Sequence, residues 1–226
     1  PSIWLRFNRT SLPVVRLNLN QIEGYRNFCN KLWNASRFVT MNTAEIKLQD
    51  INLDSENMTL ADHWIQSKLH ELINTIARHI TSYRLDLVAR TLYDFVWHDY
   101  CDWYLELSKS ILNNEKTTQT QKQTTRFNLL ITMETTLRCL HPIIPFITEE
   151  IWQSFTDNKE NQSIMTEPYP EADDFTYDQN IMDQMDWLIG FVSNIRQIRS
   201  EMNISPKKKI SVLLKETSSI EIERLK

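Results

Sequence analysis

Glycine is almost missing from this chain. Its 226 residues include only Gly24 and Gly190, where average usage of about 7% would give roughly 16. Phosphate-cradling loops, such as the P-loop or the Gly-x-Gly-x-x-Gly turn, need several residues without a Cβ close together. Tight turns between strands also depend on glycine. The shortage therefore excludes a nucleotide site of the glycine-loop kind and favours helices over a sheet-rich fold.

Other absences concern the location of the protein. No apolar run approaches the ~20 residues that a membrane-spanning helix requires, and no secretion leader precedes the first expected helix. The three cysteines, Cys29, Cys101 and Cys139, are odd in number and form no Cys-x-x-Cys pair, which does not suit a disulfide framework. We therefore expect a cytoplasmic protein with reduced thiols and no membrane partner.

Residues that could perform chemistry are scattered. None of the five histidines has a glutamate three residues before it, although Glu-x-x-His is the pairing typical of metal sites in helix bundles. Glu149 and Glu150 are adjacent, so their side chains would diverge on a helix rather than share a proton transfer. We expect no catalytic residue and no metal ligand here.

Charge is distributed unevenly behind a net value of −4. Residues 1–40 include six basic residues and one acidic residue, residues 149–186 include eleven acidic and one basic, and residues 196–215 include six basic and one acidic. Segregated charge of this kind suits a protein that meets a polyanion at one face. An uneven but merely solvated surface is the competing interpretation.

Apolar residues recur at steps of three and four along most of the chain, which predicts helices. The expected helices cover residues 21–41, 60–84, 86–112, 127–140, 145–155 and 179–203. Polar residues 113–125 and acidic residues 156–178 are expected to form loops, and residues 210–214 a short strand. The sequence therefore predicts an all-α, up-and-down bundle of about five long helices.

The same pattern divides the chain into four parts. Residues 1–20 form an irregular lead-in, and residues 21–156 form the core of the bundle. Residues 157–178 form the acidic loop, and residues 179–226 form the last bundle helix with the beginning of a further segment.

The first expected helix carries a polar face. Asn27, Asn30, Asn34 and Arg37 fall at steps of three and four, and Phe38 adjoins them. Amides can bond base edges, arginine supplies forked donors, and phenylalanine supplies a flat surface, which together suit the splayed bases of single-stranded RNA. The alternative is an ordinary amphipathic helix with a solvated asparagine side and Phe38 in the core.

Four blocks of sequence carry a family resemblance. They are Glu23 to Phe38, Phe95 to Glu106, Leu140 to Trp152 and Asn194 to Pro206. In order and spacing these blocks resemble the valyl-tRNA synthetases, a family of class I aminoacyl-tRNA synthetases. The first block is the most specific, whereas the block around His141-Pro142 is shared widely among class I synthetases for apolar amino acids. The resemblance covers about residues 21–215 and implies a helical anticodon-binding domain.

The resemblance also implies a binding site. In this family an Arg-Phe pair at the end of the first helix lies against the anticodon, with the Phe stacked on its bases, and Arg37 and Phe38 match that pair. Leu105 matches a leucine that walls the base pocket. From helical spacing alone we add Asn30, Asn34 and Asp102 as candidates.

Two further sets of residues complete the expectations. Candidates for contacts with backbone phosphates are Arg26, Lys31, Arg196, Arg199, Lys207 and Lys208. Residues expected in the core are Trp33, Trp103 and the cluster of Pro142, Pro145 and Phe146.

The chain departs from the family in what it lacks. The adenylate-forming motifs His-Ile-Gly-His and Lys-Met-Ser-Lys-Ser, the editing domain and the coiled-coil arm are absent, and residues 1–20 do not read like the family. We therefore expect no cofactor in this stretch, with ATP and Mg²⁺ required only by the full-length valine–tRNA ligase. The expected partners are valine tRNA and the rest of the synthetase chain, not DNA. The alternative is an interdomain helical scaffold with little RNA binding of its own.

Overall fold

The computed structural model describes residues 19–46, 55–155, 162–205 and 208–212. The helices and helical turns of this part are α1 (Leu19–Thr43), η2 (Ser55–Asn57), α2 (Leu60–Thr81), α3 (Leu85–Asp94), the π-helix η3 (Phe95–Tyr104), α4 (Leu105–Asn113), α5 (Gln119–Leu140), α6 (Pro145–Gln153), η4 (Ile164–Thr166), η5 (Ala172–Asp174) and α7 (Gln179–Glu201). The predicted all-α class is confirmed. The lead-in expected over residues 1–20 lies outside the described residues, except that its last two residues belong to α1.

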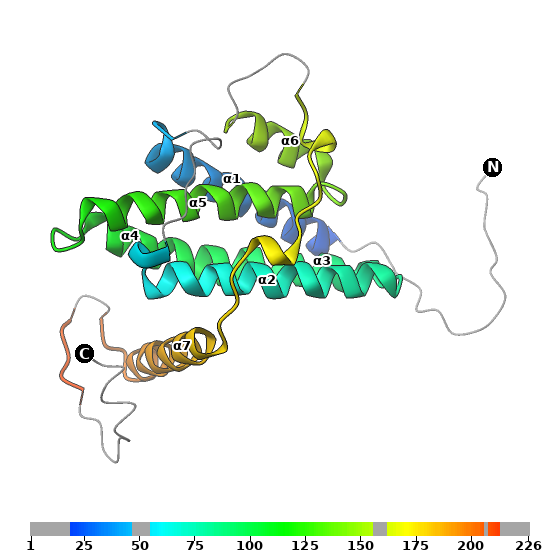
Figure 1. Cartoon of the computed structure of the whole chain (residues 1–226). Coiled ribbons are helices and arrows are strands. Elements are labelled where there is room, and N and C mark those ends of the chain that lie inside the picture. Colours follow the sequence, from blue (N-terminus) through cyan, green and yellow to red (C-terminus); the bar gives the residue numbers. More distant parts are fainter. Residues whose placement is uncertain (1–18, 47–54, 156–161, 206–207, 213–226) are drawn as a thin grey trace.

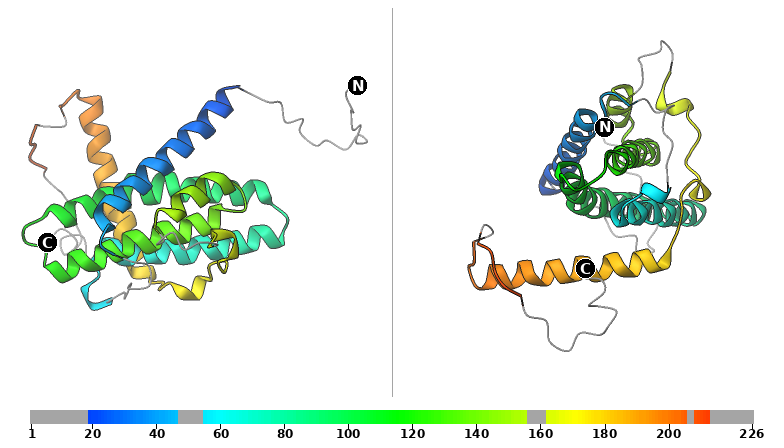
Figure 2. Two further views of the ribbon diagram at one scale, coloured as in Figure 1. Left: turned by 90° about the horizontal axis from the view of Figure 1, so that it is seen from above. Right: turned by 60° about the vertical axis from the view of Figure 1, so that its left-hand side comes forward.

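Long helical runs alternate in direction through the bundle. α1, α2, the continuous run α3–η3–α4, and α5 pass back and forth in turn (Figure 1). α7 departs from this pattern, because it crosses the α2 side of the bundle at a steep angle (Figures 1 and 2). Its C-terminal half and the N-terminal end of α1 both project beyond the bundle on the same side (Figure 2, left).

Two helices begin at capping boxes. The Thr59 side chain accepts from the Asp62 N–H while the Asp62 carboxylate accepts from the Thr59 N–H, and Thr118 and Gln121 repeat the arrangement before α5. The Thr118 side chain thereby accepts from the Gln121 N–H, which would otherwise be unpaired at the helix start. The helix expected from residue 127 therefore begins at Gln119, and most of the predicted loop over residues 113–125 is helical.

Two helices end at a non-glycine residue in the left-handed conformation that glycine usually adopts. Tyr83 (φ 57°) and Asn203 (φ 52°) adopt the left-handed conformation after α2 and α7. At each end two N–H groups return to the last turn, for example from Arg84 to the His79 carbonyl at 2.9 Å and from Ile204 to the Arg199 carbonyl at 2.8 Å. This is the Schellman arrangement, in which glycine is usual and asparagine tolerated.

A fully buried carboxylate joins three elements of the core. Asp62 accepts hydrogen bonds from the Tyr104 hydroxyl at 2.7 Å and the Thr125 hydroxyl at 2.9 Å, in addition to its capping contacts with Thr59. The donors come from η3 and α5, so this one side chain fixes α2 against both. Buried charge of this kind is tolerated because its oxygens are fully hydrogen-bonded.

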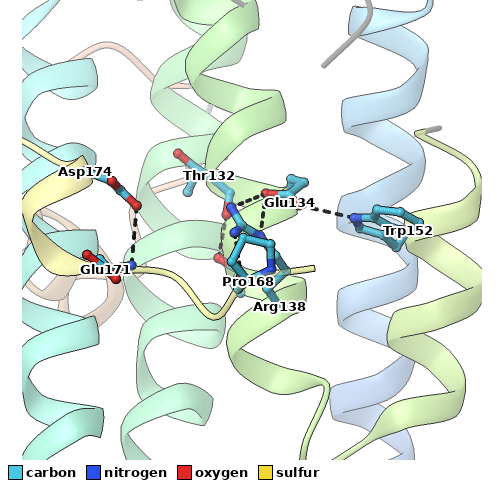
Figure 3. A network of polar contacts seen from close by, with 8 residues as sticks. Thr132, Glu134, Arg138, Trp152, Pro168, Glu171 and Asp174 are labelled. Atoms are coloured by element: carbon cyan, nitrogen blue, oxygen red, sulfur yellow. Dashed lines mark hydrogen bonds and ion pairs between the residues drawn. The ribbon is translucent and has the colours of Figure 1, made fainter. Parts of the chain in front are cut away.

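The segment Gln162–Asp178, which we call the strap, crosses the bundle from α6 to α7 (Figure 1). The Glu134 carboxylate accepts from Arg138 at 3.0 and 2.8 Å and from the Trp152 indole at 3.2 Å, and Arg138 also donates to the Pro168 carbonyl at 2.8 Å (Figure 3). The strap is thereby held on the bundle by a nearly buried ion pair.

Some residues expected in the core lie at the surface. Trp33 is 42% exposed and Phe146 is 90% exposed, and Pro142 and Pro145 are exposed as well. The reason is helical phase, because α6 buries Thr148, Ile151 and Trp152, which leaves Phe146 on the opposite side. Trp103 is half-buried against the core, as expected.

The prediction of a short strand over residues 210–214 is also wrong for the residues that the structure describes. Residues 210–212 have no regular secondary structure, and residues 213–214 lie outside the described residues. A single strand has no partner to complete its hydrogen bonds, and none is present among the described residues.

Candidate nucleic-acid interface

The polar face expected on α1 is present. Leu32, Ala35 and Val39 are buried in the core, while Asn30, Asn34 and Arg37 are exposed. The exposed set follows the helical repeat that the sequence indicated. The end of α1 therefore presents amide and guanidinium donors on one surface.

Phe38 lies at the border of this face. It is half-buried and packs against the core, so part of its ring is covered and the rest is accessible to solvent. The Lys109 ammonium of α4 lies 5.4 Å from the centroid of its ring. A cation at that distance is attracted to the ring face, so a positive charge adjoins the aromatic surface.

Lys31 and Asp102 are partners of each other. The Lys31 Nζ donates to Asp102 Oδ1 at 2.7 Å, and its ammonium lies 3.9 Å from the centroid of the Trp97 ring. The second carboxylate oxygen of Asp102 lies 3.4 Å from His98 Nδ1. The sequence assigned Lys31 and Asp102 to separate contacts with RNA, whereas here they neutralise each other.

An aromatic stack fastens α1 to the run α3–η3. The Phe28 and Tyr93 rings stack at 5.2 Å between centroids, and the Tyr93 and Trp97 rings stack at 5.4 Å. The Lys31 ammonium lies over the Trp97 ring as well. Because these rings contact one another across two elements, we regard this stack as a structural clamp rather than a free stacking surface.

The π-helix η3 positions the residues around this clamp. Its wide turns place Trp97, Asp102 and Trp103 toward the surface while the Tyr100 hydroxyl donates to the Leu129 carbonyl at 3.1 Å inside the core. π-helical turns are rare and often occur at functional sites. Leu105, directly after η3, is 5% exposed and belongs to the core.

The basic candidates near the C-terminus differ from one another. The Arg196 guanidinium carbon lies 5.0 Å from the centroid of the Trp103 ring, and Arg196 is exposed. Arg199 instead donates to the backbone carbonyls of Ser205 and Lys208, the first at 2.9 Å. Lys208 is exposed, and Lys207 lies outside the described residues.

Arg26, the remaining basic candidate, lies on the projecting part of α1. Its side chain is 70% exposed, and its guanidinium is 3.6 Å from Glu23. A pair this exposed is worth little, because water and salt screen it. Arg26 therefore remains available to a polyanion.

The described side chains do not favour covalent chemistry. Burial raises the pKa of Cys101 to about 12 and that of Cys139 to about 12, so both thiols stay protonated and unreactive. Within the described ranges, no group of three or more His, Cys, Asp and Glu side chains is arranged to hold a metal ion. None of the helices in those ranges combines the length and apolar character needed to cross a membrane.

Sequence reasoning missed several residues of this surface. Lys109 beside Phe38, Trp97 beside Lys31, and Trp103 beneath Arg196 each bring a partner from a different helix. Pairing across helices depends on the packing of the bundle, so spacing along one helix contains no signal for it. The resemblance over Phe95 to Glu106 pointed to the segment but not to these pairs.

This chain is similar to known proteins along most of its length. Residues 62–214 match the family described as the anticodon-binding domain of tRNA ligase. The valine–tRNA ligase of Legionella pneumophila (strain Lens) is 44% identical over 217 residues, which is 93% of this chain and 24% of that protein. The valine–tRNA ligase of Psychrobacter arcticus is 39% identical over 232 residues, or 98% of this chain and 24% of that protein. The chain thus spans about a quarter of the length of these relatives.

Proposed function

Because the chain belongs to the family of anticodon-binding domains of tRNA ligases, we propose that it binds the anticodon arm of a tRNA, and specifically of valine tRNA. The observation that carries the proposal is the exposed donor face of α1 beside a half-buried aromatic ring. The two relatives named above, both valine–tRNA ligases, support valine tRNA as the partner.

Each residue of the α1 face has a distinct role in the proposed complex. Phe38 offers its accessible face to an anticodon base, where stacking is worth about 1–3 kcal/mol. Arg37 supplies forked donors to a base edge or a phosphate, and Asn30 and Asn34 bond base edges. Leu105 belongs to the core rather than touching a base, since it is 5% exposed.

Binding at this site would serve a reaction that takes place elsewhere. We propose that the full-length protein is a cytoplasmic valine–tRNA ligase, whose catalytic part binds ATP and Mg²⁺ outside the present chain. Holding the anticodon arm orients the acceptor end toward that part, and binding energy used for orientation raises the rate of a distant step.

One set of observations favours the alternative, an interdomain scaffold with little RNA affinity. Phe38 packs partly against the core, and Lys31 and Asp102 satisfy each other. If those contacts persist in the complex, fewer side chains are available to bind RNA than we expected from the sequence.

The deciding experiment is a comparison of two transcripts. Binding of a valine tRNA transcript to this chain is measured at low salt beside the same transcript with its anticodon replaced. We expect weaker binding of the altered transcript, because the α1 face reads bases. A change in the acceptor stem should have a smaller effect. Equal affinity for the native and altered transcripts would support the scaffold instead.

A further inference from the structure

Arg196 is held by the face of an indole at the point where α7 leaves the bundle. Its guanidinium carbon lies 5.0 Å from the centroid of the Trp103 ring. Trp103 is half-buried against the core, so the ring is a fixed surface rather than a mobile one. Beyond this contact α7 carries exposed Ile198, is followed by exposed Met202, and projects past the bundle (Figure 2).

This geometry leaves the donors of Arg196 available. A guanidinium over a ring is attracted through its charge, so this contact uses none of its five N–H donors. Among the described residues, no hydrogen bond or ion pair involves the Arg196 side chain. Arg199, one turn further on, differs because it donates to the Ser205 and Lys208 carbonyls and so closes the turn after α7.

The surroundings of Arg196 suit an anion. A groove of about 870 Å³ follows the last turns of α7, and it is lined by Val192, Ile195, Arg196, Arg199, Ser200, Asn203, Ile204 and Ser205. Exposed Lys208 and Lys209 follow in the chain, and Glu201 is the one acidic residue between positions 196 and 212. A local excess of positive charge attracts a polyanion to this end of α7.

We propose that Arg196 binds a backbone phosphate of the tRNA and that Trp103 is the positioning residue that holds its guanidinium in place. This inference rests on the proposed function, since it names a second contact for the same RNA. The contact with Trp103 restricts the guanidinium, so binding the phosphate costs less side-chain entropy than it would for an arginine without such a contact. The contact reads no base, because phosphates carry no sequence information.

The test compares single variants by the salt dependence of tRNA binding. Each phosphate contact releases condensed counterions, so its loss reduces the slope of log K against log salt by roughly one. Arg196→Gln is expected to reduce the slope by about this amount and to weaken binding about tenfold at low salt. The loss should be equal for transcripts with native and replaced anticodons. Arg78→Gln, which removes a charge from the far end of α2, is the matched control and should leave the slope unchanged.

Trp103 is tested without changing the charge. Trp103→Leu is expected to weaken tRNA binding severalfold while keeping most of the slope, and Trp103→Phe to restore part of the affinity, because a smaller ring still supports the guanidinium. Adding Trp103→Leu to Arg196→Gln should cause no further loss. A merely structural Trp103 would instead lower the melting temperature and leave the affinity of the folded protein unchanged, which would overturn the positioning role.

The possible outcomes distinguish a failure of this inference from a failure of the proposed function. If the wild-type chain binds tRNA and Arg196→Gln behaves like Arg78→Gln, the phosphate contact is wrong while the proposed function stands. If the wild-type chain does not bind tRNA at all, the proposed function fails, and this inference fails with it.

Discussion

Lys31 on α1 and Asp102 on the π-helix form a direct ion pair, with Nζ and Oδ1 2.7 Å apart. The Lys31 side chain is 24% exposed, and the Trp97 ring covers its ammonium. The pair therefore links the helix that carries the proposed base-reading residues to the segment that carries Trp103. A charge engaged in this way is less available to RNA than its place in the sequence indicates.

Neutralising Lys31 should consequently matter less for tRNA than neutralising Arg37. We expect Lys31→Gln to lower tRNA affinity less than Arg37→Gln, because Arg37 is exposed and Lys31 is paired. The two dissociation constants are compared at one salt concentration, since phosphate-dependent affinity varies steeply with salt. An equal or larger loss for Lys31→Gln would show that the pair opens when RNA binds.

Truncation of Phe38 separates its two roles. Phe28 is buried, so Phe28→Ala should cost about 3–5 kcal/mol of stability, whereas Phe38→Ala should cost less than about 3 kcal/mol because its ring is only half-buried. Phe38→Ala should also lower tRNA affinity about tenfold. Urea unfolding measures the first effect and tRNA titration the second. A full core penalty without any loss of affinity would favour the scaffold.

Asp99 should make the bundle less stable as the pH rises. Burial raises its pKa above the ordinary value of 3.8, although Lys68 and His98 lower it, and Glu71 and Asp186 add to the rise. A carboxyl whose pKa is raised in the folded state binds more protons when the protein is folded. The free energy of unfolding therefore falls as the pH rises from the unfolded-state pKa to the folded-state pKa.

Asp99→Asn is therefore expected to raise the free energy of unfolding at neutral pH. The advantage over the wild type should shrink as the pH falls through the folded-state pKa, and it should vanish below 3.8. Asp94→Asn, an exposed carboxylate on α3, controls for net charge. A stabilisation that is independent of pH would contradict the burial effect.

The ion pair beneath the strap should be far more sensitive to the loss of one partner than of both. Arg138→Met leaves Glu134 as a buried carboxylate with the Trp152 indole as its remaining donor among the contacts described above, at an expected cost of about 3–5 kcal/mol. Combining it with Glu134→Gln removes the uncompensated charge and should recover part of that loss. Urea unfolding of the single and double variants measures this. A double variant no more stable than Arg138→Met would contradict the view that the unpaired Glu134 charge causes the loss of stability.

Tyr83 offers a way to stabilise the protein. Its φ of 57° is costly for a residue with a Cβ, and its side chain is 91% exposed. Tyr83→Gly should raise the free energy of unfolding by about 0.5–1 kcal/mol through relief of this strain. Tyr83→Ala keeps the Cβ and serves as the control. Thermal melting of the two variants decides, since equal melting temperatures would exclude a backbone effect.

Much of the fold followed from hydrophobic spacing, and the errors have local causes. We could predict two features of the helices from the sequence, because helical period and capping act over a few residues. They are the buried positions Trp64, Leu69 and Ile76 on α2 and the proline at the start of α6. The start of α5 was misplaced because Thr118 and Gln121 form a capping box inside a tract whose composition resembles a loop. The steep crossing of α7 has no counterpart in its own sequence pattern.

The proposed binding surface was less predictable than the fold. The donor face of α1 followed from the helical repeat, and the roles of Arg37, Phe38 and Leu105 came from family resemblance. The partners of Lys31, Phe38 and Arg196 lie on other helices, so they depend on how those helices pack. The actual contacts of these residues with RNA stay predictions.

The buried carboxylate of Asp62 also bears on the order of events during synthesis. Its donors Tyr104 and Thr125 lie 42 and 63 residues further along the chain, and ribosomes add about 5–20 residues per second. Until Thr125 has emerged from the ribosome, the Asp62 carboxylate lacks one of its donors, and the apolar stripe of α2 lacks the α5 surface that covers it. The apolar surface in the N-terminal half of the nascent bundle thus stays incompletely buried for seconds. During that time it is the surface that a chaperone would bind.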